Sequence, residues 1–443
     1  MTEGRWNGRM APVPKRSLLL LFVGVTLFAP SLIARTRPAT RPGTTPTFSL
    51  EVSRIFQQHC QVCHRDGGIA PFSLEDYRSA RTRAGMIQYV TEERTMPPWH
   101  AAEGCGEFRN VRRLTDRQIQ IIGEWVAAGT PEGDPSMLPP PLEFPSGWAL
   151  GEPDLEVQTV GTFTPEASGD SWRCYVMPHD VEQDTYLNAF DFLPVSVGDV
   201  HHMIAYVDTS GRAEELDALD EEEGYDYSSY GLGFEPAGFI GVFTIGERVF
   251  HLPDDVAIRL AAGSRIVIQV HYHTHGGHVT PDQPKVGLYF SDEPVRRTLN
   301  FESILNADLY LPAGDPSVLV TASEVITEPI TIYSMGGHMH YLGREFDVYA
   351  TMPNGSTDCL LQIDDWDQRW QGMYEYATPV RIPAGSLIEA RAVYDNSASN
   401  PNNPHSPPVD IHWGESAEQE MMIAYLTYTR DSEDLTIDPS VPE

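Results

Sequence analysis

Positive charge is scarce in this chain of 443 residues, which has 30 Lys and Arg against 63 Asp and Glu and a net charge of −33. Because phosphate binding needs concentrated positive charge, this balance argues against nucleic acid as a partner. The chain is not a disordered acidic protein either, since 41% of its residues are hydrophobic and 10% are aromatic. At one domain per ~150 residues, the length indicates about three domains.

Long hydrophobic runs are also missing, with one exception near the N-terminus. Residues 17–34, SLLLLFVGVTLFAPSLIA, follow Arg9, Lys15 and Arg16. A positive flank before a short apolar stretch is typical of a secretory signal, and this stretch is also near the lower length limit for a membrane span. We therefore expect residues 1–34 to be a signal peptide or N-terminal membrane anchor, and the protein to be exported to a periplasmic or other extracytoplasmic space.

Cysteine is rare, with five residues, and two of them lie in the phrase Cys60-Gln-Val-Cys63-His64. C-x-x-C-H is the attachment motif of c-type haem, in which the two thiols bond the vinyl groups and the adjoining imidazole binds the iron. The alternatives are a redox dithiol or half of a zinc site, but the chain has no second C-x-x-C to complete a zinc ribbon.

Helix signals surround this motif. Capping boxes begin at Ser73 and Thr115, and the second is followed by a helical pattern that we expect to stop near Gly129. Between them lies Met96, in a Pro-stiffened phrase typical of the distal haem ligand of a cytochrome c, with His100 as the rival ligand. We predict a small all-α cytochrome c domain over residues 48–134, with linkers at 35–47 and 135–154.

The rest of the chain lacks helix-length periodicity and carries alternating strands instead. Residues 264–273 are the clearest case, and the pattern indicates antiparallel β-sandwich structure. One face of this predicted strand carries Ile266, Ile268, Val270 and Tyr272, and the other carries Val267, Gln269, His271 and His273.

Histidines gather in three clusters that a hydrophobic core does not require. Alternation places His338 and His340 on one face of a strand, as a pair of metal ligands. Imidazole and thioether ligands suit copper, and zinc, the competing metal, gains nothing from Met. The clusters are His201-His202-Met203, then His271, His273, His275 and His278, then His338-Met339-His340.

At these residues the sequence resembles the copper type II, ascorbate-dependent monooxygenases, which include peptidylglycine α-hydroxylating monooxygenase and dopamine β-monooxygenase. The resemblance covers roughly residues 155–430. It is carried by Asp199-Val-His201-His202-Met203, by Gln269-Val-His271-Tyr-His273, by His338-Met-His340 and by Glu420-Met421.

The resemblance implies a multidomain protein in which the cytochrome domain is followed by two all-β, jelly-roll-like copper domains, here 155–298 and 299–432, with an acidic tail at 433–443. It implies two copper ions with an open cleft between them. The first copper would be held by His201, His202 and His271, and the second by His338, His340 and Met421, with Tyr425 beside the substrate.

Spacing alone does not choose His271 over His273, or Met421 over Met422. Alternation adds that Met421 and Tyr425 share a strand face while Met422 points away.

The sequence also departs from the family. Peptide-amidating members have an arginine where this chain has Gly336 and an asparagine where it has Ile423, so peptide amidation is not expected. Disulfides typical of the animal enzymes are mostly missing; Cys174 and Cys359 could pair and leave Cys105 over, but sequence supplies no distance.

The function we expect is copper-dependent hydroxylation of a C–H bond of a small organic substrate with O2. Electrons would come from ascorbate, a redox protein or the fused haem. The alternative is an exported haem and copper protein for electron transfer or copper binding without hydroxylase turnover. A cytochrome with a structural β-domain would leave the histidine clusters unexplained. The acidic run at 214–226 is interpreted as a solvated loop.

Overall fold

The described part of the chain lies within one compact unit, Thr45–Glu443. The predicted signal or anchor at 1–34, most of the 35–47 linker and the end of the acidic tail lie outside the described residues. No helix in the described ranges is long and apolar enough to cross a membrane. The computed structural model describes residues 45–68, 70–144, 147–177, 179, 181–193, 199–227, 232–244, 249–275, 279–414 and 416–436.

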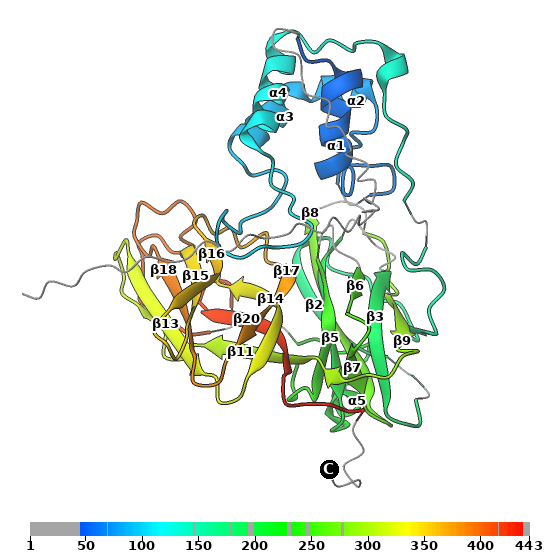
Figure 1. Cartoon of the computed structure of the whole chain (residues 1–443), viewed down its shortest axis with the longest axis vertical. Coiled ribbons are helices and arrows are strands. Elements are labelled where there is room, and N and C mark those ends of the chain that lie inside the picture. The colour runs from blue at the N-terminus through cyan, green and yellow to red at the C-terminus, as the bar shows by residue number, and fades with distance from the viewer. Residues whose placement is uncertain are drawn as a thin grey trace, which may run out of the picture. The chain divides into compact units, whose positions relative to one another are not determined.

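Helices occupy the first part of the described chain (Figure 1, blue to cyan). They share a core of their own in which Phe56, Ile122 and Trp125 are fully buried. The elements are the π-helix η1 (Phe48–Val52), α1 (Ser53–His59), α2 (Tyr77–Thr82), α3 (Ala84–Glu92), α4 (Asp116–Ala127) and the 3-10 helix η2 (Pro135–Met137).

One of the two predicted capping boxes is confirmed and the other is wrong. Thr115 and Gln118 form the reciprocal box that begins α4, and the helix ends before Gly129, whose φ is 82°. Helix α2 begins at Tyr77, and its N-cap is Asp76, whose side chain accepts the N–H of Ser79. Ser73 instead hydrogen-bonds Glu75 within a turn, since its hydroxyl satisfies a nearer N–H.

Two sheets pack on one core in the middle of the chain, an arrangement compatible with the expected β-sandwich. Their orders are β1-β9-β3-β7-β10, with β6 beside β3, and β2-β8-β4-β5. The elements are β1 (Leu155–Gln158), β2 (Ser168–Met177), β3 (Thr185–Leu193), β4 (Val200–Asp208), α5 (Arg212–Asp217), β5 (Gly238–Thr244), β6 (Val249–His251), β7 (Val256–Leu260), β8 (Arg265–His275), β9 (Lys285–Phe290) and β10 (Arg297–Thr298).

The next strands form a second pair of sheets around a separate core. Their orders are β11-β20-β14-β17 and β13-β18-β15-β16, with the short pair β12-β19 beside them. The elements are β11 (Asn300–Leu305), β12 (Tyr310–Leu311), β13 (Val318–Val325), β14 (Ile330–His338), β15 (Gly343–Thr351), β16 (Thr357–Ile363), β17 (Met373–Ile382), β18 (Leu387–Tyr394), β19 (Ile411–His412) and β20 (Ile423–Arg430).

Strand β8 shows why the alternating pattern at 264–273 was informative. Ile268, Val270 and Tyr272 point into the core shared by the first two sheets. Gln269 and His271 point to the opposite face, where Gln269 lines a cavity and His271 contacts its partner strands. The period of two in the sequence is therefore the period of the pleated strand.

The acidic run at 214–226 is more than a solvated loop, which corrects the prediction. Arg173 of β2, whose side chain is only 4% exposed, pairs with Asp220 at 3.0 Å and donates to the backbone oxygens of Glu223 and Gly224. Tyr225 is buried and forms a β-bridge with Cys174. A buried guanidinium needs such partners, so the run is anchored to the sheet.

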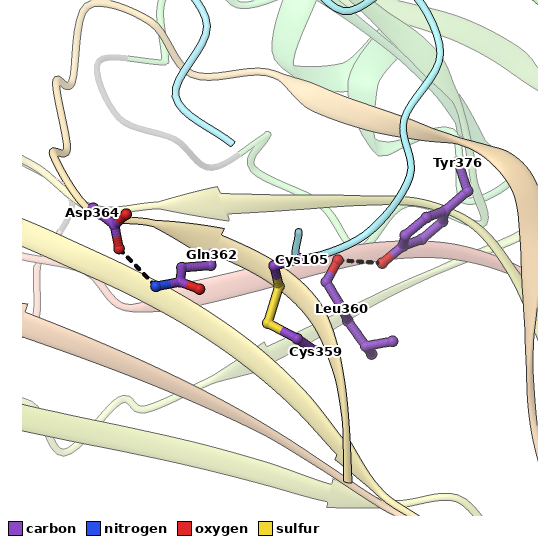
Figure 2. The surroundings of a disulfide bond; sticks show 6 residues. All are labelled: Cys105, Cys359, Leu360, Gln362, Asp364 and Tyr376. Carbon is purple, nitrogen blue, oxygen red and sulfur yellow. Dashed lines mark hydrogen bonds between the residues drawn. A yellow bond between two sulfur atoms is a disulfide. The ribbon is translucent and has the colours of Figure 1, made fainter. Parts of the chain in front are cut away.

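A disulfide joins Cys105, in the segment between α3 and α4, to Cys359 of β16, with 5.2 Å between the Cα atoms (Figure 2). This differs from the Cys174–Cys359 pair considered from the sequence. Cys174 is instead a fully buried thiol, and burial raises its pKa to about 12. Sequence separation contains no information on which strands meet, so only the fold identifies the partner.

Residues 99–110, here called the arm, lie along β16 and β17. The N–H of Ala102 donates to the oxygen of Gln362, and that of Arg109 donates to Glu375, each at 2.7 Å. The aromatic ring of Trp99 lies 5.2 Å from that of Tyr374. Figure 2 shows Cys105 beside Leu360, whose carbonyl accepts the hydroxyl of Tyr376. The arm is thus held to the second pair of sheets by backbone bonds, ring contacts and a disulfide.

Candidate metal centre

A cavity of about 340 Å³ lies between the sheet that contains β4 and β8 and the sheet that contains β14 and β20. His202 and Gln269 line it from the first sheet. His338, Met421 and Tyr425 line it from the second. One space therefore brings together residues from two of the three histidine clusters and from the Met421 segment, which are up to 219 positions apart.

His338 is the last residue of β14, and His340 follows just beyond the strand. The prediction that one strand carries both is therefore wrong, but the rings do meet, with centroids 5.1 Å apart and planes at 89°. His338 is 3% exposed and His340 is fully buried. Burial lowers the pKa of both rings, that of His338 to about 3, so both are neutral at neutral pH.

Each of these rings is oriented through its Nδ1 atom. The Nδ1 of His338 contacts the side-chain oxygen of Gln371, and the Nδ1 of His340 lies 3.0 Å from the backbone oxygen of Gln419. Because those oxygens can only accept, Nδ1 carries the proton of each neutral ring, and the lone pair is on Nε2. A hydrogen bond of this kind at Nδ1 holds a histidine in the orientation in which its Nε2 atom can bind a metal ion.

The sequence correctly predicted that Met421 and Tyr425 lie on one face of the chain and that Met422 points to the other. Met421, Ile423 and Tyr425 line the cavity, while Met422 is fully buried in the core of the second pair of sheets. Met421 precedes β20, which begins at Ile423, so the extended pattern starts two residues before the strand. The thioether at the cavity is therefore that of Met421.

Glu420 is a buried residue whose structural role the sequence motif did not indicate. Its two carboxylate oxygens accept the backbone N–H groups of His340 and Leu342, at 2.7 and 2.6 Å. Burial raises its pKa to about 8, against the opposing effect of those N–H groups. The side chain ties the segment after β14 to the segment before β20, which carry His340 and Met421.

Replacing Glu420 by Ala is expected to lower the free energy of unfolding by about 3 kcal/mol, because two buried N–H groups lose their acceptor. Glu420→Gln keeps one acceptor oxygen and should therefore lose less stability than Glu420→Ala. Urea denaturation of both variants measures this, with Glu418→Ala, at an exposed neighbour, as the control. Equal stability of Glu420→Ala and the parent would contradict the tethering role.

His202 and His271 come together on the other side of the cavity. They are register partners on β4 and β8, with ring centroids 5.0 Å apart. Trp172 of β2 stacks on His271 at 3.9 Å with the planes almost parallel, which fixes that ring. The side chains of His201 and of His273, the alternative third ligand, lie outside the described residues, as does His278. The structure thus places two of the three predicted ligands together.

The donor sets fit a soft metal ion better than a hard one. Within the described residues, no three His, Cys, Asp or Glu side chains form a group able to hold a metal. The structure does place the thioether of Met421 on the same cavity wall as His338, with the ring of His340 beside that of His338. Two neutral imidazoles with one thioether suit copper, and Cu(I) in particular.

The Cys60–Cys63–His64 motif lies at the end of α1. Cys60 is the C-cap residue of that helix, and the N–H groups of Cys63 and His64 both donate to its backbone oxygen. Both cysteines are thiols, and burial raises the pKa of Cys60 to about 12. The Nδ1 of His64 donates to Phe72 O at 3.1 Å, which leaves its lone pair on Nε2, as a haem ligand requires.

The two candidates for the distal ligand lie in different surroundings. Met96 follows α3 and donates its N–H to Val90 O. His100 belongs to the arm, where burial lowers its pKa and the carboxylates of Asp367 and Asp365 oppose that change. His100 thus lies near acidic residues of the second pair of sheets, an interaction that the sequence did not indicate.

Comparison with known families gives one match. Residues 318–438 match the model described as copper type II ascorbate-dependent monooxygenase, C-terminal domain. This range contains His338, His340, Met421 and Tyr425. The match supports a copper-dependent oxidoreductase function for this part of the chain, with O2, an ascorbate-type reductant and an organic substrate as the reactants that the family implies. A search of curated proteins gives no match.

Solved structures offer only distant similarity. PNGF-II is 11% identical with a TM-score of 0.27 over 61% of this chain and 64% of its own. The major capsid protein P2 of bacteriophage PM2 is 8% identical, with a TM-score of 0.27, over 62% and 97%. A putative secreted protein from Eubacterium rectale is 10% identical with a TM-score of 0.20 over 58% and 68%. This chain therefore spans less than two thirds of PNGF-II, and these similarities carry no functional argument.

Proposed function

We propose that the protein is a copper-dependent monooxygenase that hydroxylates a C–H bond of a small organic substrate, in the manner of the dopamine β-monooxygenase class. One observation carries the proposal. In the region that matches the family, His338 and Met421 line a small-molecule-sized cavity, and the ring of His340 lies beside that of His338.

In this proposal His338, His340 and Met421 would hold a copper ion. That ion would supply redox chemistry in which one oxygen atom of O2 enters the substrate and the other leaves as water, with two electrons from the reductant and two protons. The chain's own residues prepare the site: Gln371 and the Gln419 backbone orient the two imidazoles, and burial keeps them neutral. Tyr425, on the cavity wall, contacts the substrate.

A second copper ion, for electron transfer, is assigned to His201, His202 and His271. The support is that His202 and His271 meet across β4 and β8 and that Trp172 holds the ring of His271. His202 also lines the cavity that His338 lines, so residues of both proposed copper sites face one cavity.

The electrons are proposed to come from ascorbate, from a redox protein or from a haem c on Cys60 and Cys63, with His64 and Met96 as its axial ligands. The free thiols and the oriented ring of His64 fit such a group. The arm supports an electron-delivering role, because it fastens the segment that follows Met96 to β16 and β17. The disulfide is also consistent with the proposed export to an extracytoplasmic space, with or without membrane anchoring.

The alternative is a haem and copper protein for electron transfer without hydroxylase turnover. The C-x-x-C-H motif and the paired histidines are expected in both kinds of protein, so they do not distinguish the two candidates. A cavity of small-molecule size favours the enzyme, because an electron-transfer site does not need room for a small molecule.

The test begins with elemental analysis of the exported, copper-loaded protein, for which about two coppers per haem iron are expected. Oxygen uptake with reductant is then followed as organic substrates are added. Uptake that depends on an organic substrate supports the monooxygenase. Two coppers with uptake that no substrate changes would favour the electron-transfer protein, and copper near zero would overturn both copper assignments.

A further inference from the structure

The described side chains that line the cavity between the two pairs of sheets carry no formal charge. Among the described residues that line it there is no Asp, Glu, Lys or Arg. The polar groups on its wall are neutral, such as Gln269, Ser303 and Gln371. A charged substrate group that enters would lose part of its hydration and would find no ionic partner among these side chains, which is costly.

Aromatic rings form one continuous wall of this cavity. Phe239 of β5 stacks on Phe301 of β11 at 4.3 Å with planes at 21°, and Phe301 stacks on Tyr425 of β20 at 5.5 Å with planes at 25°. The ring of Tyr425 lies 6.3 Å from that of His338. The stack therefore crosses from the first pair of sheets to the second and ends beside the proposed copper site. A flat ring placed in the cavity has an aromatic surface to lie against.

The structure also shows what fills the space in front of Gly336, the position at which the peptide-amidating members have an arginine. Gly336 pairs with Met373 across β14 and β17. A Cβ atom built on Gly336 would lie 2.7 Å from the sulfur of Met373, so that thioether fills the space in front of the glycine. Met373 lines the cavity as well. An uncharged, polarisable side chain thus stands where an anion-binding residue would have to project.

We infer that the ligand of this cavity is a small, uncharged, largely apolar molecule that carries an aromatic ring, and that neither a carboxylate nor an ammonium group enters with it. This inference rests on the proposed function for its chemistry, because it names the substrate class of that same site. It also explains what stands in front of Gly336: the uncharged thioether of Met373 fills that space and supplies no ionic partner for a carboxylate.

The test uses three probes that share one ring and differ in charge: 2-phenylethanol, 2-phenylethylammonium and phenylacetate. Each is titrated calorimetrically into the whole copper-loaded chain without reductant, so that binding is measured without turnover, and again into the copper-depleted chain to remove any ligation of the metal by the probe. The neutral probe is expected to bind at least about tenfold more tightly than either ion to the copper-depleted chain, in which no metal charge adds to that of the side chains. A charged probe that binds as tightly as the alcohol, or failure of all three to bind, would overturn the inference.

A variant pair tests the role of Met373. Met373→Arg places a guanidinium at the cavity and should tighten phenylacetate binding by at least about tenfold, because the carboxylate gains a charge-assisted partner. Met373→Leu, the uncharged control of similar volume, should bind the three probes in the same order of affinity as the parent. Unchanged phenylacetate binding by a folded Met373→Arg variant would contradict the role assigned to Met373. If that variant does not fold, the relative affinities of the three probes for the parent chain decide the inference.

The outcome is separable from that of the proposed function. Selective binding of 2-phenylethanol with no substrate-dependent oxygen uptake would support the ligand class and contradict the monooxygenase. Substrate-dependent uptake that is fastest with a charged probe would support the monooxygenase and contradict the ligand class.

Discussion

Replacing His338 by Ala is expected to lower the copper content from about two to about one per chain and to reduce substrate-dependent oxygen uptake by at least about 100-fold. Changes to groups that merely orient a ligating histidine already cost ~10–100-fold in metal affinity or activity, so removal of the ligand itself should cost more. The ring is 3% exposed at the end of β14 and its Nδ1 is held by Gln371, so few other side chains can replace it.

Copper and haem iron are measured by elemental analysis, and uptake is measured on the same samples. His412→Ala is the matched control, because His412 is an exposed histidine on the short strand β19. It should keep both copper ions and the parent uptake. A His338→Ala variant that retains two coppers, with its circular dichroism unchanged, would remove His338 from the proposed ligand set.

Breaking the disulfide with the Cys105→Ser and Cys359→Ser substitutions is expected to lower the free energy of unfolding by about 2–5 kcal/mol. The bond closes a loop of 254 residues, and the loss of such a link gives the unfolded chain more conformational freedom. It also releases the arm from one of its attachments to β16. Haem-to-copper electron transfer is therefore expected to slow in the same variant, since the helical segment is then held by fewer contacts.

Urea denaturation measures the stability change, and stopped-flow haem reoxidation measures the electron transfer. Reduction of the parent protein by dithiothreitol should reproduce the loss of stability. Cys174→Ser is the control for the other pairing considered from the sequence: its thiol is buried and unreactive, so the disulfide should survive this substitution. Mass mapping that finds Cys174 joined to Cys359 would contradict the structure.

Local patterns in the sequence were reliable where a single period or motif decides the structure. The alternation at 264–273 separates Ile268 and Val270 in the core from Gln269 at the cavity, because a pleated strand must present successive side chains to opposite faces. The capping box at Thr115 begins α4, since its two hydrogen bonds involve only residues of the first turn. The choice of Met421 over Met422 for the cavity follows from the same rule.

Predictions that depended on distant neighbours were less successful. The acidic run at 214–226 is tied to Arg173 by contacts across 47 to 51 positions, which no local pattern reveals. His340 lies beyond the end of β14, because Glu420 accepts its N–H where a strand partner would otherwise do so. The roles of the copper and haem ligands stay predictions, since the sequence proposed them and the structure supplies their surroundings.

By itself the sequence determined the residue types of the site, the two faces of strand β8 and the β-rich part of the chain, because these depend on neighbours within a few positions. Only the tertiary structure decided that Cys105 pairs with Cys359, that the arm lies along β16 and β17, and that Met373 fills the space before Gly336. It also decided that Phe239, Phe301 and Tyr425 form one wall beside His338. These contacts join residues that are far apart in the chain, and their pairing is settled by the packing of whole sheets, which has no local signature.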